Sequence, residues 1–537
     1  MSKAYADAPT GAPTGTPTDD ATGDLGDLLF DDADWNFKIL SKTYDAIERV
    51  ALDDLGLNVY PNQVEIISTE QMLDAYSSFG MPLMYRHWSF GKHFARDEKS
   101  YRQGHSGLAY EIVINANPCI SYNLEDNSMP LQALVMAHAA FGHNHFFKNN
   151  YLFRQWTDAD GVLDYFQYAK KFIAGAEERH GLEEVEKVLD AAHAIMDQGV
   201  FRYRRAPELT TEQRQARKRE IEEYRERTFN DLWRTLPDKE GAEEATEAEK
   251  EKLARRKQLH LPEENLLFFL EHNSPILDGW QREILAIVRN VAQYFYPQRQ
   301  TKVMNEGCAT FTHHYVMNAL YDRGQIGEGA MLEILHSHSN VLFQPDFDDQ
   351  RFNGINPYAL GFAMMCDIRR ICTEPTDEDR EWFPDLAGSE DWRGALRHAW
   401  TNYRDESFIR QYLSPYLMRK MKLFDLTDNA EDSHYVVGAI HDEQGYRKVR
   451  DALANNHDPA HTDADIQVVD ADLRGDRQLI LEHSVRNGIG LAEDSRTEVL
   501  KHIRELWGYE VTLSGIDHDN GKQLYRTSTI EAEDGGA

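Results

Sequence analysis

Three histidines lie close together in an unusually apolar stretch of the sequence. The run LQALVMAHAAFGHNHFFKNN, residues 131–150, contains His138, His143 and His145 and has no acid, lysine or arginine before Lys148. Apolar residues recur on every side of a helix drawn through this run, so the helix is predicted to be buried together with its imidazoles. A buried polar group without a partner costs about 1–3 kcal/mol, so partners or a shared ligand are expected.

A second apolar segment offers such a partner. In KVMNEGCATFTHHYVMNALY, residues 302–321, helical spacing places Glu306, Thr310 and His313 on one face. The two helices are predicted to satisfy each other's polar groups, either by direct hydrogen bonds or by sharing a metal ion. Neutral imidazoles with a carboxylate suit zinc or iron better than calcium.

The order of these segments resembles the layout of gluzincin peptidases, in which two helical histidines and the glutamate of an NEGxA-like motif hold zinc. The matching residues are His138, His143 and Glu306. The two histidines are five positions apart, where the peptidases have four, and in a regular helix this spacing separates them by about 140°. A π-bulge at Gly142 would bring the two rings back onto one side.

The peptidase layout also lacks one group. Ala139 occupies the position that holds the general base in the peptidases, so the sequence identifies no proton acceptor for a metal-activated water. His313 lies about 10 Å along the helix axis from Glu306, so it is expected to orient a ligand rather than to bind the ion. A metal centre and a structural hydrogen-bonded network both remain compatible with these residues.

A third segment, INPYALGFAMMCDIRRICTEP, places charges inside an apolar helix. Asp367, Arg369 and Arg370 are predicted to form internal ion pairs, with Asp405 or Glu406 as candidate partners. Such pairs perturb pKa values whether or not they take part in catalysis, and the interpretation favoured here is a structural one. The glycine-rich patterns GxGxxG, GxxxxGK[ST] and GxSxG are absent, so dinucleotide, P-loop and α/β-hydrolase chemistry find no support.

Composition narrows the classes of function further. The chain of 537 residues carries a formal charge of −33, which disfavours binding to nucleic acids and to anionic membranes. The many acids, with arginine more frequent than lysine, suggest a cytosol kept at high salt, and a halophilic source is our hypothesis. The 4 cysteines form no CxxC motif, and neither a signal peptide nor a membrane span is indicated, so a reducing cytoplasm is expected.

The predicted fold class is α+β. Apolar residues recur at helical spacing through most of the chain to about residue 424, whereas YEIVINANPCISYNLE, residues 110–125, has the alternation of a strand. Beyond residue 428, alternating segments predict strands on either side of one amphipathic helix. The expected domains are a disordered tail at 1–33, a mainly helical domain at 34–427 with a charged helical arm at 204–260, a small α+β domain at 428–525, and an acidic tail at 526–537.

Four long motifs together resemble the stage V sporulation protein R (SpoVR) family over roughly residues 34–520. They are ALVMAHAAFGHNHFFKNNYLF, MNEGCATFTHHYVMN, NPYALGFAMMCDIRRICTEPTDEDREWFPDLAG and RDESFIRQYLSP, in this order. The chain departs from the family pattern at Cys308, where the family has Trp, and at His145, where it has Asp or another residue. His145 is therefore the weakest metal candidate.

The resemblance implies a cytoplasmic protein linked to spore cortex formation or, in non-sporulating relatives, to a stress response. It further implies action with a PrkA-like serine protein kinase and a von Willebrand-type protein, but no known reaction. Two hypotheses follow. The chain is either a non-catalytic component that docks through residues 204–260, or a zinc-dependent hydrolase of an amide in a peptide or cell-wall precursor. Binding of a small anion or nucleotide at the His and Glu cluster stays a third alternative.

Overall fold

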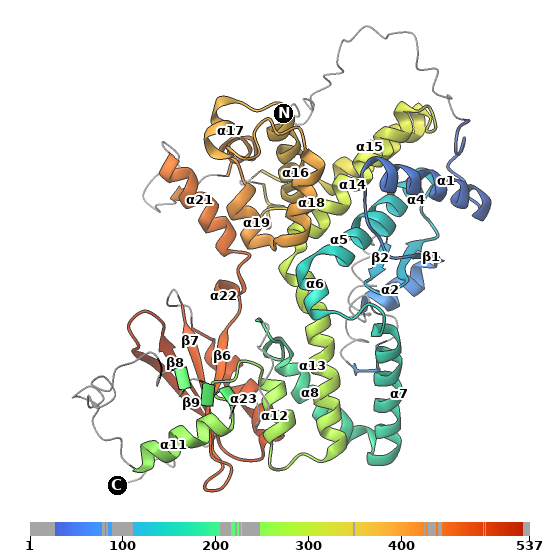
Figure 1. Ribbon diagram of the computed structural model, residues 1–537. Helices are drawn as coiled ribbons and strands as arrows, with labels where there is room; N and C mark the ends of the chain where they lie inside the picture. The colour runs from blue at the N-terminus through green and yellow to red at the C-terminus, as the bar shows by residue number, and fades with distance from the viewer. Residues whose placement is uncertain are drawn as a thin grey trace.

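The structure, a computed structural model, has a mainly helical upper part and a lower part that combines helices with a sheet (Figure 1). The fold class is α+β, as predicted. The structure describes residues 27–77, 81, 84–88, 111–203, 216–217, 219–220, 223–224, 227, 247–346, 349–423, 425–427, 436–438, 443–486, 488 and 490–529. No helix within these ranges is both long enough and apolar enough to cross a membrane.

The upper part is built around helices that share one hydrophobic core. Its elements are α1 (Phe37–Arg49), the π-helical η1 (Val50–Asp54), α4 (Met129–Met136), the π-helical η2 (Ala137–His143), α5 (Asn144–Asn149), α14 (Lys302–Asp322), α15 (Glu328–Val341), α16 (Pro357–Thr373), α17 (Asp377–Trp382), α18 (Trp392–Asn402), α19 (Asp405–Tyr412), α20 (Pro415–Lys420) and α21 (Glu443–Asn455).

A 3-stranded sheet lies beside these helices. Its strands are β1 (Asn62–Ile67), β2 (Glu111–Ile114) and β3 (Cys119–Leu124), and α2 (Thr69–Ser77) follows β1. The order is β1-β3-β2, with β3 parallel to β1 and antiparallel to β2. The single strand expected at 110–125 is thus two strands, because the chain turns through Asn117 and Pro118 between them.

The lower part joins long helices to a 4-stranded sheet of order β6-β7-β8-β9. Its elements are α6 (Tyr151–Trp156), α7 (Val162–His180), α8 (Leu182–Ala194), η3 (Met196–Gln198), α11 (Glu247–Gln258), α12 (Leu266–Asn273), α13 (Gly279–Gln300), α22 (Pro459–Thr462), β6 (Asp465–Ala471), β7 (Leu479–Val485), α23 (Glu493–Trp507), β8 (Val511–Asp517) and β9 (Gln523–Ser528). A separate short ribbon pairs β4 (Asp425–Thr427) with β5 (Val436–Gly438).

The C-terminal sheet shares its core with helices from earlier in the chain. Leu481 of β7, Trp507 of α23, Leu189 of α8 and Val288 of α13 belong to one buried cluster. The sheet therefore packs its apolar face on the helical region, whereas Leu453 and Ala454 of α21, which also lie within the predicted domain at 428–525, belong to the core of the upper part. Figure 1 shows α13 and α14 following one another from the lower part into the upper part.

Two expectations about surface segments need correction. Leu29 and Phe30, placed in the predicted N-terminal tail, are buried at 4% and 5% exposure, because large apolar side chains gain free energy by joining the core. Residues 1–26 and 530–537 lie outside the described residues. Most of the predicted arm at 204–260 also lies outside them, but α11 is fixed to the sheet by Arg255, which makes two hydrogen bonds to Asp470.

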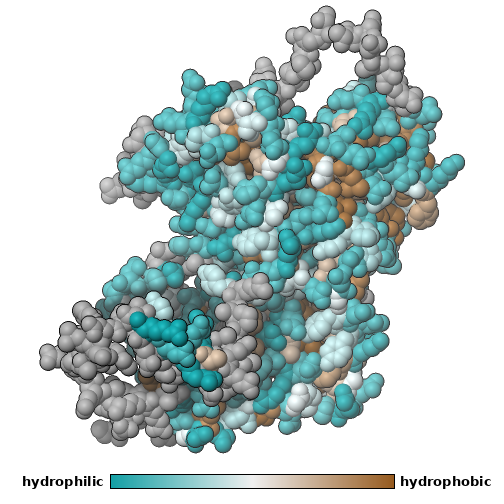
Figure 2. Space-filling model, in the orientation of Figure 1, coloured by the Kyte–Doolittle hydropathy of each residue, from teal (hydrophilic) through white to brown (hydrophobic). Residues whose placement is uncertain are grey.

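The surface agrees with the acidic composition. Figure 2 shows hydrophilic residues over most of the face in view, with hydrophobic residues gathered mainly toward its upper right. Buried histidines and glutamates lie close together where η2, α14 and β2 meet.

Candidate metal centre

The turn that carries His138 and His143 is π-helical, as predicted from their spacing. The π-helical η2 spans Ala137–His143 between the regular helices α4 and α5. Its wider turn brings residues five apart close together, and the two rings lie with their centroids 4.6 Å apart. Gly142 permits close contact with α14, since a Cβ built on it would lie 2.4 Å from the Cα of Ala309.

A second close crossing fixes the helix that carries Glu306. Gly307 of α14 faces Gly361 of α16, and a Cβ on Gly361 would lie 2.1 Å from the carbonyl oxygen of Val303. The first turn of α14 is held by Asp405, whose carboxylate accepts hydrogen bonds from the backbone N–H groups of Val303 and Met304 at 2.9 Å. Glu306 thus projects from a helix whose position is set on two sides.

Two imidazoles and two carboxylates converge at this place. The Nε2 atom of His138 lies 3.6 Å from Oε1 of Glu111 and 3.7 Å from Oε2 of Glu306. The Nε2 atom of His143 lies 3.5 Å from the same Glu306 oxygen. One potential ligand atom from each of Glu111, His138 and His143 lies within 4.8 Å of the others. The structure therefore brings His138, His143 and Glu306 together, as the sequence predicted.

The four side chains differ in their access to solvent. The imidazoles are nearly enclosed, with His138 5% and His143 9% exposed, whereas Glu306 and Glu111 are 17% and 18% exposed. The carboxylates are consequently the more exposed members of the cluster.

Burial and the neighbouring charges shift the pKa values of these four groups in different directions. Burial lowers the pKa of His143 to about 4, so this ring is neutral. Burial also opposes protonation of His138, but the adjacent carboxylates of Glu306 and Glu111 outweigh it and raise the pKa of His138. Burial raises the pKa of Glu111, whereas in Glu306 the neighbouring histidines outweigh burial and lower the pKa.

Three of the separations between donor atoms are compatible with a tetrahedral metal ion. Ligand bonds of about 2.0–2.1 Å place neighbouring donors roughly 3.3–3.5 Å apart around a tetrahedral zinc ion. The separations of 3.5–3.7 Å between these nitrogens and oxygens are close to that value and too long for good hydrogen bonds. The Oε2 atom of Glu306 is buried and has no hydrogen-bond partner among the described residues. An ion at this place would satisfy that oxygen and both imidazoles.

Supporting hydrogen bonds leave Nε2 of each histidine directed at the carboxylates. The Nδ1–H group of His143 donates to Oδ1 of Asn305 at 2.9 Å, and Nδ1 of His138 lies 3.0 Å from Nδ1 of His313. His313 thus makes the contact expected of a residue that orients a ligand. The Tyr358 side chain hydrogen-bonds Glu306 and contributes to its lowered pKa.

Two other candidates, Thr310 and His145, are buried as well. Thr310 is fully buried on α14, and its hydroxyl has no hydrogen-bond partner among the described residues. His145 lies on the far side of the run, where its Nδ1 atom accepts a hydrogen bond from the backbone N–H of Asn58 at 2.9 Å. The ring of His145 packs against Trp400, so it belongs to the core and not to the cluster.

The predicted ion pairs are present in part. Arg370 donates to Asp367 at 2.8 Å and makes two hydrogen bonds to Asp379, at 2.6 and 2.8 Å. Asp379 follows Thr376 in a capping box at the start of α17, which places it beside the arginine. Arg369 lies over the ring of Trp392, 4.9 Å from its centroid.

Asp405 and Glu406 have other partners than those predicted. Asp405 accepts the backbone N–H groups at the start of α14, because helix N-termini offer donors that no residue within the helix can use. Burial raises the pKa of Asp405 to about 7. Glu406 pairs with Arg410 one turn later on its own helix, at 2.9 Å, and with Arg404.

The sequence did not identify Glu111 or Tyr358. Glu111 stands at the start of the apolar strand β2, so an acid in YEIVINANP was the available signal. Tyr358 follows Pro357 at the start of α16 and is indistinguishable in the sequence from an ordinary core aromatic. Only the packing of β2 and α16 beside η2 and α14 brings both side chains to the cluster.

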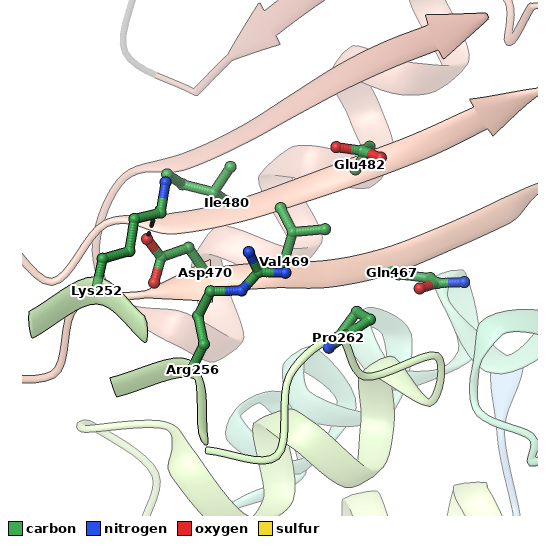
Figure 3. Close-up of a pocket in the computed structure, with 8 residues that line it drawn as sticks. All are labelled: Lys252, Arg256, Pro262, Gln467, Val469, Asp470, Ile480 and Glu482. Carbon is green, nitrogen blue, oxygen red and sulfur yellow. Dashed lines mark ion pairs between the residues drawn. The ribbon is translucent and has the colours of Figure 1, made fainter. Parts of the chain in front are cut away.

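A separate cavity lies in the lower part of the molecule. It has a volume of about 300 Å³ between α11 and the sheet, and Figure 3 shows Lys252 and Arg256 facing residues of β6 and β7. Lys252 pairs with Asp470 at 3.8 Å. The His and Glu cluster is formed by other elements, so the two places are distinct.

Comparison with known proteins identifies the chain. The family model described as SpoVR like protein matches residues 34–462, and the model described as SpoVR-like C-terminal domain matches residues 464–518. The chain belongs to the SpoVR family. A relative from Escherichia coli (strain K12), described as "Uncharacterized protein YcgB", is 51% identical over 496 residues, which cover 92% of this chain and 95% of the relative. No solved structure matches.

Proposed function

We propose that this SpoVR family member is a metal-dependent hydrolase whose zinc or iron ion is held by His138, His143 and Glu306. The observation that carries the proposal is the buried Oε2 atom of Glu306, which lies 3.5 and 3.7 Å from two imidazole nitrogens and has no hydrogen-bond partner among the described residues. A buried network that served only structure would be expected to satisfy this oxygen.

Glu111 supplies the group that the sequence lacked. It approaches from β2, opposite the helix that carries Glu306, and its Oε1 atom lies 3.6 Å from His138. We assign it the role of proton acceptor, because a carboxylate with a pKa raised by burial is better matched to proton transfer near neutral pH than an ordinary glutamate. Tyr358, hydrogen-bonded to Glu306, holds that carboxylate in place.

A bound divalent ion would supply Lewis-acid chemistry at this site, by polarising a carbonyl group and lowering the pKa of a water molecule. The chain itself directs Nε2 of both imidazoles at the carboxylates and holds Nδ1 of each ring through His313 or Asn305. The substrate class that we propose is an amide in a peptide or a cell-wall precursor.

Elemental analysis of untagged protein, purified without chelators, tests the metal site. We expect about one equivalent of zinc or iron in the wild type and less than about a tenth in H138A and H143A. The matched control is H145N, which changes a buried histidine of the same run whose contacts lie outside the cluster, and it should retain the metal. A wild-type protein with less than a tenth of an equivalent would eliminate the proposal.

A second experiment separates the ligand from the proton acceptor. The variant E111Q should keep its metal but lose hydrolysis of the probes, a fluorogenic peptide library and purified peptidoglycan, whereas E306Q should lose both. If E111Q lost the metal as well, Glu111 would be a ligand and the role of proton acceptor would be wrong.

A cellular role is proposed on the strength of the family. We propose that the protein acts in the cytoplasm, in spore cortex formation or a stress-response programme, together with a PrkA-like serine kinase and a von Willebrand-type protein. Co-purification with the kinase would support this role. The arm is tested by deleting residues 204–246 only, because α11 is fixed to the sheet through Arg255 and Asp470. Undiminished kinase binding after this deletion would contradict docking through the arm.

We also propose a halophilic source. The formal charge of −33 means that acidic side chains repel one another strongly at low ionic strength, and salt screens this repulsion. Dialysis from molar to millimolar salt should then unfold the protein, as followed by circular dichroism. A fold that is indifferent to salt would contradict this origin.

A further inference from the structure

Three histidines from three different elements form a hydrogen-bonded chain that ends at the candidate metal centre. Nδ1 of His138 in η2 lies 3.0 Å from Nδ1 of His313 in α14. Nε2 of His313 lies 2.8 Å from Nδ1 of His338 in α15. His338 is therefore two hydrogen bonds away from the ring whose Nε2 atom faces Glu306 and Glu111.

The atoms in this chain allow only one direction of donation when an ion is present. A metal on Nε2 of His138 requires that Nδ1 carry the hydrogen, because a neutral imidazole has one N–H and one lone pair. Nδ1 of His313 must then accept, so the hydrogen of His313 sits on Nε2. That N–H donates to Nδ1 of His338, whose own hydrogen sits on Nε2.

The protein encloses the second and third rings. His313 and His338 are 1% and 8% exposed. His338 is further enclosed by the rings of His314 and Phe362, at centroid distances of 4.9 Å. A buried N–H of His313 would lose its acceptor if His338 were replaced by an apolar residue.

We propose that His338 is a positioning residue that fixes the tautomer and orientation of His138 through His313, and so couples α15 to the metal centre. The inference rests on the proposed metal site, and it adds a residue that belongs to neither the ligands nor the helices that carry them. Groups that orient a metal-ligating histidine through its second nitrogen contribute to metal affinity, and their loss weakens binding by about 10–100-fold.

Zinc affinity of the full-length protein, measured by competition with a fluorescent chelator, tests the proposal. The variant H338L should bind zinc about 10–100-fold more weakly than the wild type. H338N should bind within about threefold of it, because the amide oxygen of asparagine can accept at the position of Nδ1. The matched control is H336L, which changes an exposed histidine of the same helix bonded to Asn340, and it should not alter the affinity.

The tautomers give a readout that loss of packing alone would not produce. Nitrogen NMR of protein labelled at histidine should show the hydrogen of His313 on Nε2 in the wild type, and a mixture of tautomers in H338L. Wild-type zinc affinity in H338L, or a wild-type His313 with its hydrogen on Nδ1, would overturn the inference. If the wild type bound no zinc, the proposed function would fail, whereas the tautomer of His313 would still decide whether the chain exists.

Discussion

Two buried polar clusters in the upper part of the molecule differ in how completely their charges are satisfied. Around Arg370, every carboxylate oxygen of Asp367 and Asp379 accepts at least one hydrogen bond, from the guanidinium, from Ser414 or from Thr376. In the His and Glu cluster, Oε2 of Glu306 faces two imidazole nitrogens and accepts no hydrogen bond from a described residue.

This difference separates a structural network from a site that another atom would complete. A guanidinium with two fully bonded carboxylates gains nothing from a further ligand, because its donors and acceptors are matched. Once His138 has given up the proton that its raised pKa favours, the two imidazoles and two carboxylates present an excess of acceptors, since each neutral imidazole has its one hydrogen on Nδ1. An excess of acceptors directed at one point is the arrangement that binds a cation.

The largest effect is expected from the satisfied network. R370M should lower the free energy of unfolding by about 3–5 kcal/mol, because it leaves Asp367 and Asp379 buried without their cation. Urea denaturation of the metal-free protein measures the change. Zinc affinity should stay within about threefold of the wild type. The control R369M, which removes a cation lying over Trp392, should cost about 1 kcal/mol or less.

The unsatisfied cluster should respond in the opposite way. E306Q should weaken zinc binding by about 100-fold or more, since it replaces a charged ligand by an amide. The metal-free variant should lose less stability than R370M, because Glu306 faces its imidazoles at 3.5 and 3.7 Å, whereas Arg370 is hydrogen-bonded to both of its carboxylates. A chelator competition and a urea titration check the two results. A strong loss of metal-free stability would mean that Glu306 is structural like Asp379.

The two clusters should also differ in their dependence on pH. The raised pKa of His138 means that a proton competes with zinc for this ring up to a higher pH than at an ordinary histidine. Zinc affinity should therefore rise with pH, by about tenfold per unit, until the pH reaches the pKa of His138, and level off above it. His143 adds no dependence in this range, because its pKa is about 4. Calorimetric titrations in buffers of different ionisation enthalpy should show about one proton released per zinc.

The Arg370 network should be insensitive to pH over the same range. The hydrogen bonds from Arg370 and Thr376 outweigh burial and lower the pKa of Asp379 to about 2. A carboxyl group with a lowered folded-state pKa contributes stability above its unfolded value, near 4, and loses this contribution as the pH falls through 2. In the wild type Asp379 should thus stay charged between pH 6 and pH 8, which NMR of its side-chain carboxyl carbon checks, and a titration step of Asp379 in this range would contradict this assignment.

The smallest effect is expected from the support of His143. N305L removes the oxygen that accepts the Nδ1–H group of this ring at 2.9 Å. We expect zinc affinity to fall by about tenfold, because the ring is then free to change tautomer. N305D, which keeps an acceptor oxygen, is the matched variant and should bind zinc at least as well as the wild type. Equal weakening in both variants would point to disturbed packing instead.

The part of the site that could be predicted consists of polar residues that the sequence places inside apolar segments. Imidazoles in an apolar helix identified His138 and His143, an acid among small residues identified Glu306, and the spacing of five predicted the π-helical turn that η2 adopts. These conclusions needed only helical geometry and the cost of burying polar groups. The α+β class followed in the same way from periodicity.

The remaining contacts were decided by tertiary structure. Glu111, Tyr358 and His338 come from β2, α16 and α15, and nothing local distinguishes them from a strand end, a core aromatic and a surface histidine. Asp405 bonds to the backbone at the start of α14 and not to the predicted arginines, because α14 begins beside it.

The sequence by itself thus determined which residues needed a partner, because burial and polarity are properties of each segment. Tertiary packing, including the close crossings at Gly142 and Gly361, decided which partners they received, because contacts between distant segments depend on how helices and strands pack.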